Sequence, residues 1–179
     1  MTQCNSVLEF KQKAFKMGIC DDYRKQWQQA TNNKDLADMA LTVQGADFLC
    51  ASVVNKWGVT KEQLMFALYD FANGNYVRHN QGYTSELFLY YDGKITIKST
   101  LYVVIGSEDV EIYVPRYRVA NVYLAGCKNV KINCDGAVYV VNYDKDSKVN
   151  VIRGSKDTVS VVDPSDVTDS WAFKQEVRQ

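Results

Sequence analysis

The chain has 179 residues, of which 46% are hydrophobic and 23% are charged, so it can bury a core as one domain or two small ones. Its formal net charge is zero, which argues against nucleic acid or anionic lipid as a partner, because phosphate binding normally requires a basic excess. The only histidine is His79, and this scarcity argues against an enzyme or a metal site, because both commonly use histidine. We expect no cofactor.

No segment resembles a signal peptide, and no apolar run approaches the roughly 18 to 20 residues that are needed to span a membrane. The cysteines are odd in number and irregular in spacing: Cys4, Cys20, Cys50, Cys127 and Cys134. We therefore expect a cytoplasmic protein with free thiols.

Residues 6–75 have the apolar spacing of helices. The first expected helix begins after Ser6 and ends at Gly18, and the second follows Asp21 and Asp22. The third runs from Asn33 to Val43 and the fourth from Asp47 to Trp57. The fifth has the clearest start, because Thr60 and Gln63 are the two halves of a capping box. Its apolar face contains Leu64, Ala67, Leu68 and Phe71, and Gly74 is its expected end.

The apolar period changes to two-residue alternation after about Tyr83, where Val, Ile and Tyr become frequent. Short strands are expected roughly every 8 to 12 residues, separated by Gly, Asn, Asp and Ser. The pairs expected to point inward are Ile95 and Ile97, Val103 and Ile105, Val110 and Ile112, Val122 and Leu124, Val130 and Ile132, Val138 and Val140, Val149 and Val151, and Val159 and Val161.

A phrase that begins at Gly106 repeats along this β-rich part. Residues 106–112 (GSEDVEI) match residues 126–132 (GCKNVKI), and residues 154–161 (GSKDTVSV) match them again with one extra residue. A shorter echo occupies residues 146–151. A repeat of about 20 residues that contains two short strands predicts a β-solenoid. An antiparallel β-sandwich or meander stays open as the alternative, because it has the same alternation and polar turns.

The expected fold is therefore α+β with three regions. Residues 1–80 are expected to form a helical cap and residues 81–164 a short right-handed β-solenoid. Residues 165–179 are expected to form a C-terminal capping segment that contains Trp171 and Phe173. The helices should cover the first coil near Leu87 and Leu89, because the end of a solenoid exposes unpaired strand edges and an open core.

Several tyrosines adjoin the inward residues of the expected strands. Alternation places Tyr102, Tyr113, Tyr123 and Tyr139 on the outer face of the solenoid. We predict that Tyr113, Tyr123 and Tyr139, together with Lys131, bind a partner, because tyrosine combines a large contact area with a hydrogen-bonding tip. In the alternative interpretation, the tyrosines form ladders along neighbouring coils and stabilise the sheet.

Three other sites receive less support. Residues 48–72 have the pattern of a helix-turn-helix, but the second helix lacks arginine, which favours a plain turn between two helices of the cap. His79 has no cysteine near it in sequence. Asp144, Asp146 and Asp157 lack the later Gly and Glu of a calcium loop, so a turn is favoured there.

Four stretches resemble small uncharacterised proteins carried by prophages and mobile elements of gut bacteria: residues 48–50 (FLC), 57–62 (WGVTKE), 76–78 (YVR) and 82–85 (GYTS). The resemblance covers about residues 5–145 and carries over no catalytic or binding residue. It implies an intracellular accessory protein whose partner is a host or phage protein, such as a defence nuclease.

We therefore hypothesise a non-enzymatic protein-binding protein, in its most specific form a phage-encoded inhibitor of host defence such as an anti-CRISPR. A homo-oligomer stays open. The alternatives are a DNA-binding regulator that uses residues 48–72 and a small enzyme centred on His79.

Overall fold

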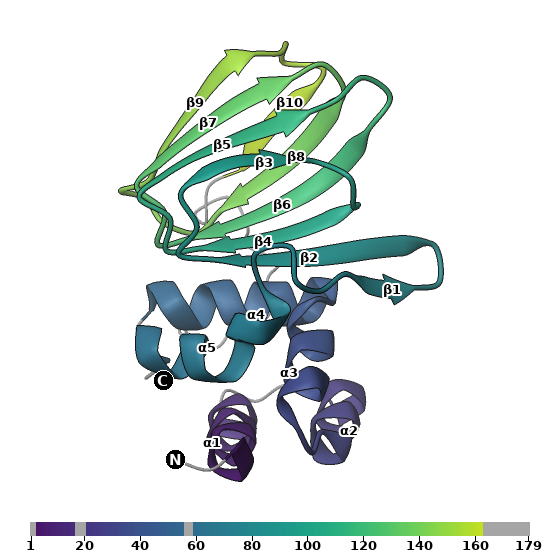
Figure 1. Ribbon diagram of the computed structural model, residues 1–179, viewed down its shortest axis with the longest axis vertical. Helices are drawn as coiled ribbons and strands as arrows, with labels where there is room; N and C mark the ends of the chain where they lie inside the picture. The colour runs from purple at the N-terminus through teal and green to yellow at the C-terminus, as the bar shows by residue number, and fades with distance from the viewer. Residues whose placement is uncertain (1–2, 17–20, 56–58, 163–179) are drawn as a thin grey trace.

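The computed structural model describes residues 3–16, 21–55 and 59–162, and in this part of the chain five α-helices precede a β-solenoid of parallel strands (Figure 1). The expected α+β fold with a solenoid is thereby confirmed, and the antiparallel alternative is wrong. The predicted helix end at Gly18, the end at Trp57 and the C-terminal segment with Trp171 and Phe173 lie outside the described residues.

The helices are α1 (Gln3–Lys16), α2 (Asp21–Gln29), α3 (Asn33–Ala40), α4 (Val43–Val54) and α5 (Lys61–Leu68), followed by the 3₁₀ helix η1 (Tyr69–Phe71). The sequence predicted that the third helix ends at Val43 and that the fourth begins at Asp47. This boundary was wrong, because α3 ends at Ala40 and α4 begins at Val43. Thr42 adopts an extended conformation and its Oγ1 accepts a hydrogen bond from the Gly45 N–H at 3.0 Å, so α4 begins directly after Thr42.

The capping box of α5 is confirmed. The Gln63 N–H donates to Thr60 Oγ1 at 3.3 Å, and the Thr60 N–H donates to Gln63 Oε1 at 3.2 Å. The α-helix ends at Leu68, earlier than the predicted stop at Gly74, because the chain tightens into η1; Gly74 lies in the turn beyond, with φ of +87°.

The strands form two sheets. The six-stranded sheet has the order β1 (Arg78–Asn80), β2 (Tyr83–Leu89), β4 (Leu101–Ile105), β6 (Val119–Ala125), β8 (Ala137–Asn142) and β10 (Val159–Val162). The four-stranded sheet has the order β3 (Gly93–Thr96), β5 (Asp109–Val114), β7 (Asn129–Cys134) and β9 (Lys148–Arg153). All pairs are parallel except β1 with β2, so each coil supplies one strand to each sheet.

The sequence repeat corresponds to stacked coils. Val110 pairs with Val130, which pairs with Val149, and all three contact the interior of the solenoid. Gly106 and Gly126 occupy the same turn of successive coils, with φ of +73° and +62°. The predicted third copy at Gly154 was placed wrongly: this glycine lies between β9 and β10, where the chain returns to the six-stranded sheet, and not in the turn of the other two.

Strand β4 corrects two side-chain assignments. Val103 and Ile105, predicted to point into the solenoid, instead belong to the core of the helical part. Tyr102, predicted to lie on the outer face, is buried inside the solenoid with Val104. All five residues of β4 are buried, so both of its faces are covered, and alternation alone cannot tell which face points inward.

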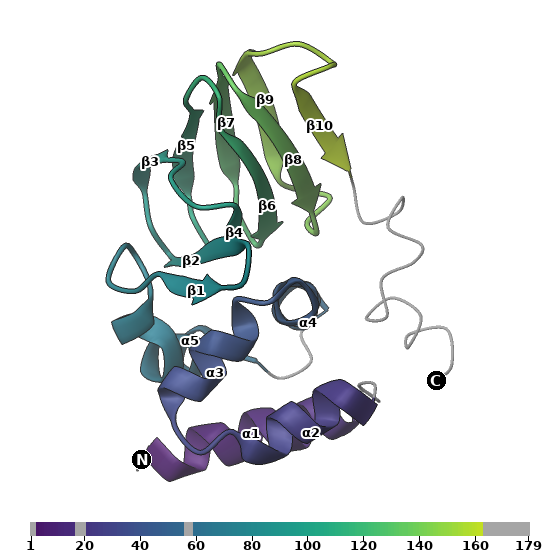
Figure 2. The same ribbon diagram turned by 90° about the vertical axis from the view of Figure 1, so that its right-hand side faces the viewer.

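The helices lie against the outer face of the six-stranded sheet at the N-terminal end of the coil stack, as Figures 1 and 2 show. Leu87 and Leu89 of β2 belong to the same buried core as the helices, and this core extends along the sheet to Val141 and Tyr143. The free edge of β2 is covered as well. Asn73 accepts a hydrogen bond from the Leu89 N–H at 2.9 Å and donates to the Leu89 carbonyl at 3.2 Å, and β1 pairs farther along the strand.

Candidate partner-binding surface

The predicted binding residues lie on two different faces. Tyr113 on β5 and Lys131 on β7 belong to the outer face of the four-stranded sheet, whereas Tyr123 on β6 and Tyr139 on β8 belong to the outer face of the six-stranded sheet. The structure therefore brings together two pairs, and not one surface of four residues.

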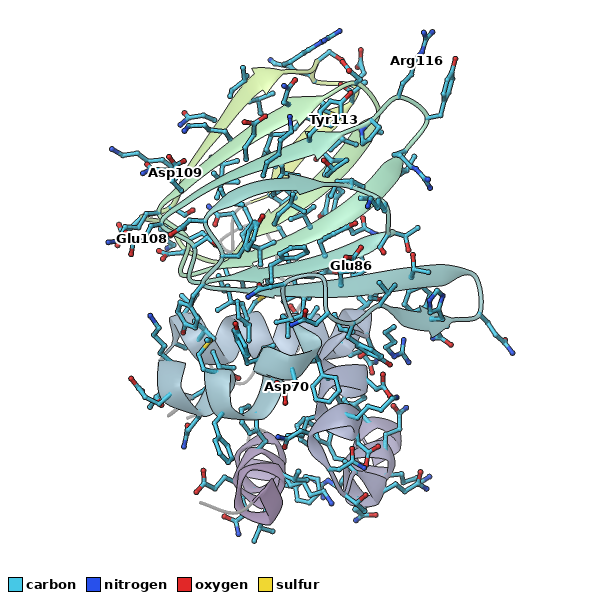
Figure 3. All side chains as sticks on the ribbon, viewed as in Figure 1. Asp70, Glu86, Glu108, Asp109, Tyr113 and Arg116 are labelled. Atoms are coloured by element: carbon cyan, nitrogen blue, oxygen red, sulfur yellow. The ribbon has the colours of Figure 1, made fainter. Side chains whose placement is uncertain are left out.

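Tyr113 and Lys131 are engaged in contacts between coils. The Tyr113 hydroxyl donates to Asp135 Oδ2 at 3.2 Å, and Lys94 Nζ lies 4.9 Å from the centre of the Tyr113 ring. Lys131 Nζ forms an ion pair with Asp109 Oδ1 at 2.9 Å. Figure 3 shows Tyr113 on the sheet and Asp109 at its edge. These contacts fit the ladder interpretation, and partner binding by this pair stays a prediction.

Tyr123 is part of the junction between the helices and the solenoid. Its ring stacks on Tyr143 with centroids 6.4 Å apart, and the Tyr143 hydroxyl donates a hydrogen bond to the Asp47 carboxylate of α4. Burial, together with nearby Asp47 and Cys50, raises the pKa of Tyr123 to about 12. Removal of the Tyr123 ring would therefore disturb packing as well as any surface contact.

The turn between β5 and β6 contains the most exposed large hydrophobic side chain of the described residues. Tyr117 is 87% exposed and has a φ of +66°, in the left-handed region that costs a residue with a Cβ roughly 1 to 2 kcal/mol. The Arg116 guanidinium lies 5.0 Å from the centre of the Tyr117 ring, and Arg118 is also exposed. Figure 3 shows Arg116 extending away from the solenoid.

An exposed strip continues from this turn onto the six-stranded sheet. Val119 at the start of β6 is 68% exposed, Asn121 is exposed, and Asn121 pairs in register with Tyr139, which is 42% exposed. We define the corner surface as Arg116, Tyr117, Arg118, Val119, Asn121 and Tyr139. It combines aromatic and apolar area with two arginines, and the helices cover the other end of the same strands.

Sequence reasoning found Tyr139 of this surface and missed the turn. Its length gave no signal: four residues, Pro115 to Arg118, separate β5 from β6, and four residues also separate β3 from β4. The exposed position of Tyr117 depends on a backbone conformation that residue spacing does not indicate.

The groups considered for catalysis that the structure describes lie on different elements. His79 is exposed on β1, where it pairs with Thr84. Cys50, Cys127 and Cys134 are free and buried, and burial raises the pKa of all three. Thiols of raised pKa are poor nucleophiles at neutral pH.

The acidic candidates occupy opposite turns. Asp144 and Asp146 lie between β8 and β9, where the Asp146 N–H donates to Asp144 Oδ1 at 3.0 Å, the hydrogen bond of an Asx turn. Asp157 lies between β9 and β10. Among the described residues, no group of three or more His, Cys, Asp and Glu side chains is close enough together to hold a metal ion.

The helix-turn-helix candidate comprises α4 and α5. Lys61 at the start of α5 lies over the Tyr90 ring at 4.4 Å, so its ammonium group contacts the solenoid. The exposed positions of α5 add Glu62 and Phe66, and neither is a residue that binds phosphate.

No single helix of the described part is long and apolar enough to cross a membrane; α3 and α4 pass the same test only as a pair bent by 98°. Comparison of the chain with protein-family models, with curated proteins and with solved structures found no match.

Proposed function

We propose that this protein is a non-enzymatic binding protein and that its corner surface docks a partner protein. The observation that carries the proposal is Tyr117, a bulky ring kept in a left-handed turn and 87% exposed. Neither the backbone preference of tyrosine nor packing against other described residues accounts for its conformation, and strained conformations that persist in a fold are concentrated at functional sites.

The chemistry of the corner surface fits a protein interface. Tyrosine and arginine are the residues that most often supply binding energy at interfaces, and Tyr117 is flanked by Arg116 and Arg118. Val119 and Tyr139 add apolar area beside them. A stacked coil on one side and the helical core on the other support the sheet beneath, so little ordering of the backbone is needed on binding.

The proposed identity of the partner is supported by a different observation from the one that supports the binding surface. In its most specific form, the proposal is that the partner is a host defence protein and that the chain acts as a phage-encoded inhibitor. This form derives from the resemblance to prophage and mobile-element proteins, and the corner surface supports only the more general statement that a protein is bound.

The test compares the two outer faces. Tagged wild-type protein is used to capture proteins from lysates of a bacterial host, in parallel with Tyr117→Ala/Tyr139→Ala and with Tyr113→Ala/Lys131→Ala as the matched control on the four-stranded sheet. We expect one specific protein to be retained by wild type and by the control and to be lost with the corner variant. Purified partner should then give at least a tenfold increase in Kd for the corner variant, about 1.4 kcal/mol.

Two results would overturn the proposal. Loss of the captured protein only with Tyr113→Ala/Lys131→Ala would move the binding site to the four-stranded sheet. Equal capture by all three proteins would show that neither outer face binds. Circular dichroism of each variant verifies that the fold is retained.

A further inference from the structure

The two sides on which the coils turn carry opposite charge. On one side, the chain passes from the four-stranded to the six-stranded sheet through turns with four basic and two acidic residues: Lys98, Arg116, Arg118 and Lys156 against Asp135 and Asp157. The turns on the other side have two basic and four acidic residues: Lys128 and Lys145 against Asp92, Glu108, Asp144 and Asp146. Figure 3 shows Arg116 and Glu108 at these opposite sides. The corner surface therefore lies on the basic side of a chain whose net charge is zero.

The neighbouring carboxylate does not neutralise the two arginines of the corner surface. Asp135 lies in the turn of the next coil, but its Oδ1 forms an ion pair with Arg153 Nε at 2.8 Å and its Oδ2 accepts the Tyr113 hydroxyl at 3.2 Å. Within the described ranges, neither Arg116 nor Arg118 has an ion pair, and both are exposed. An exposed guanidinium of this kind is available to an incoming carboxylate, which it can bind through two parallel N–H donors.

The backbone of the turn is fixed by hydrogen bonds and by close packing. The Arg118 N–H donates to the Pro115 carbonyl at 3.1 Å, and the Ala137 N–H donates to the Arg118 carbonyl at 2.8 Å. Gly136 of the next coil packs directly on the turn, because a Cβ at this position would overlap the carbonyl oxygens of Pro115 and Arg118. A turn that is already ordered loses little conformational entropy when its side chains meet a partner.

The basic charge is confined to the turns and does not continue along the sheet. The corner surface extends from Arg118 onto Val119, Asn121 and Tyr139, and none of these three is charged. Nucleic acid requires cations along a path of successive phosphates. A protein interface instead combines an apolar and aromatic centre with charged groups at its rim. The arrangement thus favours a protein over a nucleic acid as the partner.

We propose that the partner presents an acidic patch whose carboxylates pair with Arg116 and Arg118 beside the Tyr117 ring, an inference that rests on the proposed function because it concerns the same surface. Complementary charge accelerates association and excludes partners with a basic surface. Binding is therefore weakened by salt, which screens exposed charges.

Fluorescence anisotropy of labelled poly-L-glutamate, titrated with the full chain at about 20 mM salt, tests this preference. Arg116→Glu/Arg118→Glu is compared with wild type and with Lys145→Glu/Lys148→Glu, a matched control that reverses two exposed charges away from the corner surface and gives the same net charge. We expect wild type and the control to bind, and the corner variant to show at least a tenfold increase in Kd. A single-stranded oligothymidylate of about 20 nucleotides is the second probe, and it should bind wild type more weakly.

Three results would overturn the acidic preference. They are no binding of poly-L-glutamate by wild type, equal loss of binding in the two charge-reversal variants, and tighter binding of the oligonucleotide, which would assign the surface to nucleic acid. Circular dichroism verifies that each variant keeps the fold.

The docking site itself is tested separately by Tyr117→Ala/Tyr139→Ala, which keeps both arginines and should change the Kd for poly-L-glutamate by no more than about threefold. A captured protein that is lost with this variant but retained by Arg116→Glu/Arg118→Glu would support the docking site and refute the acidic patch. A captured protein that is lost with both variants supports both proposals.

Discussion

Gly106 and Gly126 lie in equivalent turns but have different neighbours. We therefore predict that substitution by alanine lowers the free energy of unfolding by different amounts at the two positions. Gly106 precedes β5 and Gly126 precedes β7, and both have positive φ. A Cβ on Gly126 would have Val53 Cγ1 as its nearest neighbour at 3.7 Å, an ordinary contact distance. A Cβ on Gly106 would lie 2.2 Å from Cε1 of Tyr90, which is too close for two carbon atoms that are not bonded to each other.

The free energies follow from these geometries. Gly126→Ala introduces only left-handed strain, about 1 to 2 kcal/mol, and part of it is offset by the reduced freedom of the unfolded chain. Gly106→Ala adds the displacement of the Tyr90 ring, and overpacking of this kind costs about 1 to 3 kcal/mol more. The displaced ring also moves away from Lys61, whose Nζ lies 4.4 Å from the ring centre, so the first turn of α5 is affected.

Urea unfolding of both variants measures the difference, and a double-mutant cycle with Tyr90→Ala locates its cause. We expect Gly106→Ala to lower the free energy of unfolding by more than Gly126→Ala, and the excess to disappear when Tyr90 is replaced. Equal costs within about 0.5 kcal/mol, or an excess that persists without the ring, would refute the reasoning.

Three further substitutions or treatments probe other parts of the fold. Asn73→Gly keeps a backbone that accepts φ of +57° but removes both side-chain hydrogen bonds to Leu89, so urea titration should show a loss of about 1 to 3 kcal/mol, and no loss would contradict the edge-covering role. Because the pKa of Tyr123 is raised to about 12, this residue stabilises the fold below pH 10 and that contribution is lost as the pH rises through about 12. The stability of wild type relative to Tyr123→Phe, from urea unfolding at several pH values, should therefore decrease above pH 10, whereas a pH-independent difference would exclude the mechanism. Cys50 and Cys127 are buried with raised pKa, so iodoacetamide should label them, by peptide mass spectrometry, only when urea unfolds the chain; rapid labelling of the native protein would contradict their burial.

The interior of the solenoid was predictable because its coils impose the same environment at a fixed interval. Val110 and Val130 are both 0% exposed and pair directly, and the sequence has valine at both positions. The prediction was wrong at β4, where Tyr102 and Val103 exchanged their expected faces. The helices bury one face of β4 and the solenoid buries the other, so the strand is apolar throughout and the two-residue period that identifies an inward face is lost.

The candidate binding surface was harder to predict from the sequence, since alternation indicates whether a side chain points outward but not which sheet carries it. Tyr113 and Tyr139 are both outward, yet the turn between β5 and β6 separates them onto different sheets. Tyr117 belongs to that turn and has no periodic pattern at all. Its φ and its exposure are properties of the folded turn, and the residue spacing does not indicate them.

The helical part decides which region of the six-stranded sheet is available to a partner. Val103 and Ile105 of β4 and Ala125 at the end of β6 belong to the helical core, and the Asp47 carboxylate of α4 accepts a hydrogen bond from the Tyr143 hydroxyl just beyond β8. The starts of β6 and β8 stay exposed, and the corner surface lies there. The helices thus cover one half of these strands, and the proposed binding site occupies the other half together with the turn that contains Tyr117.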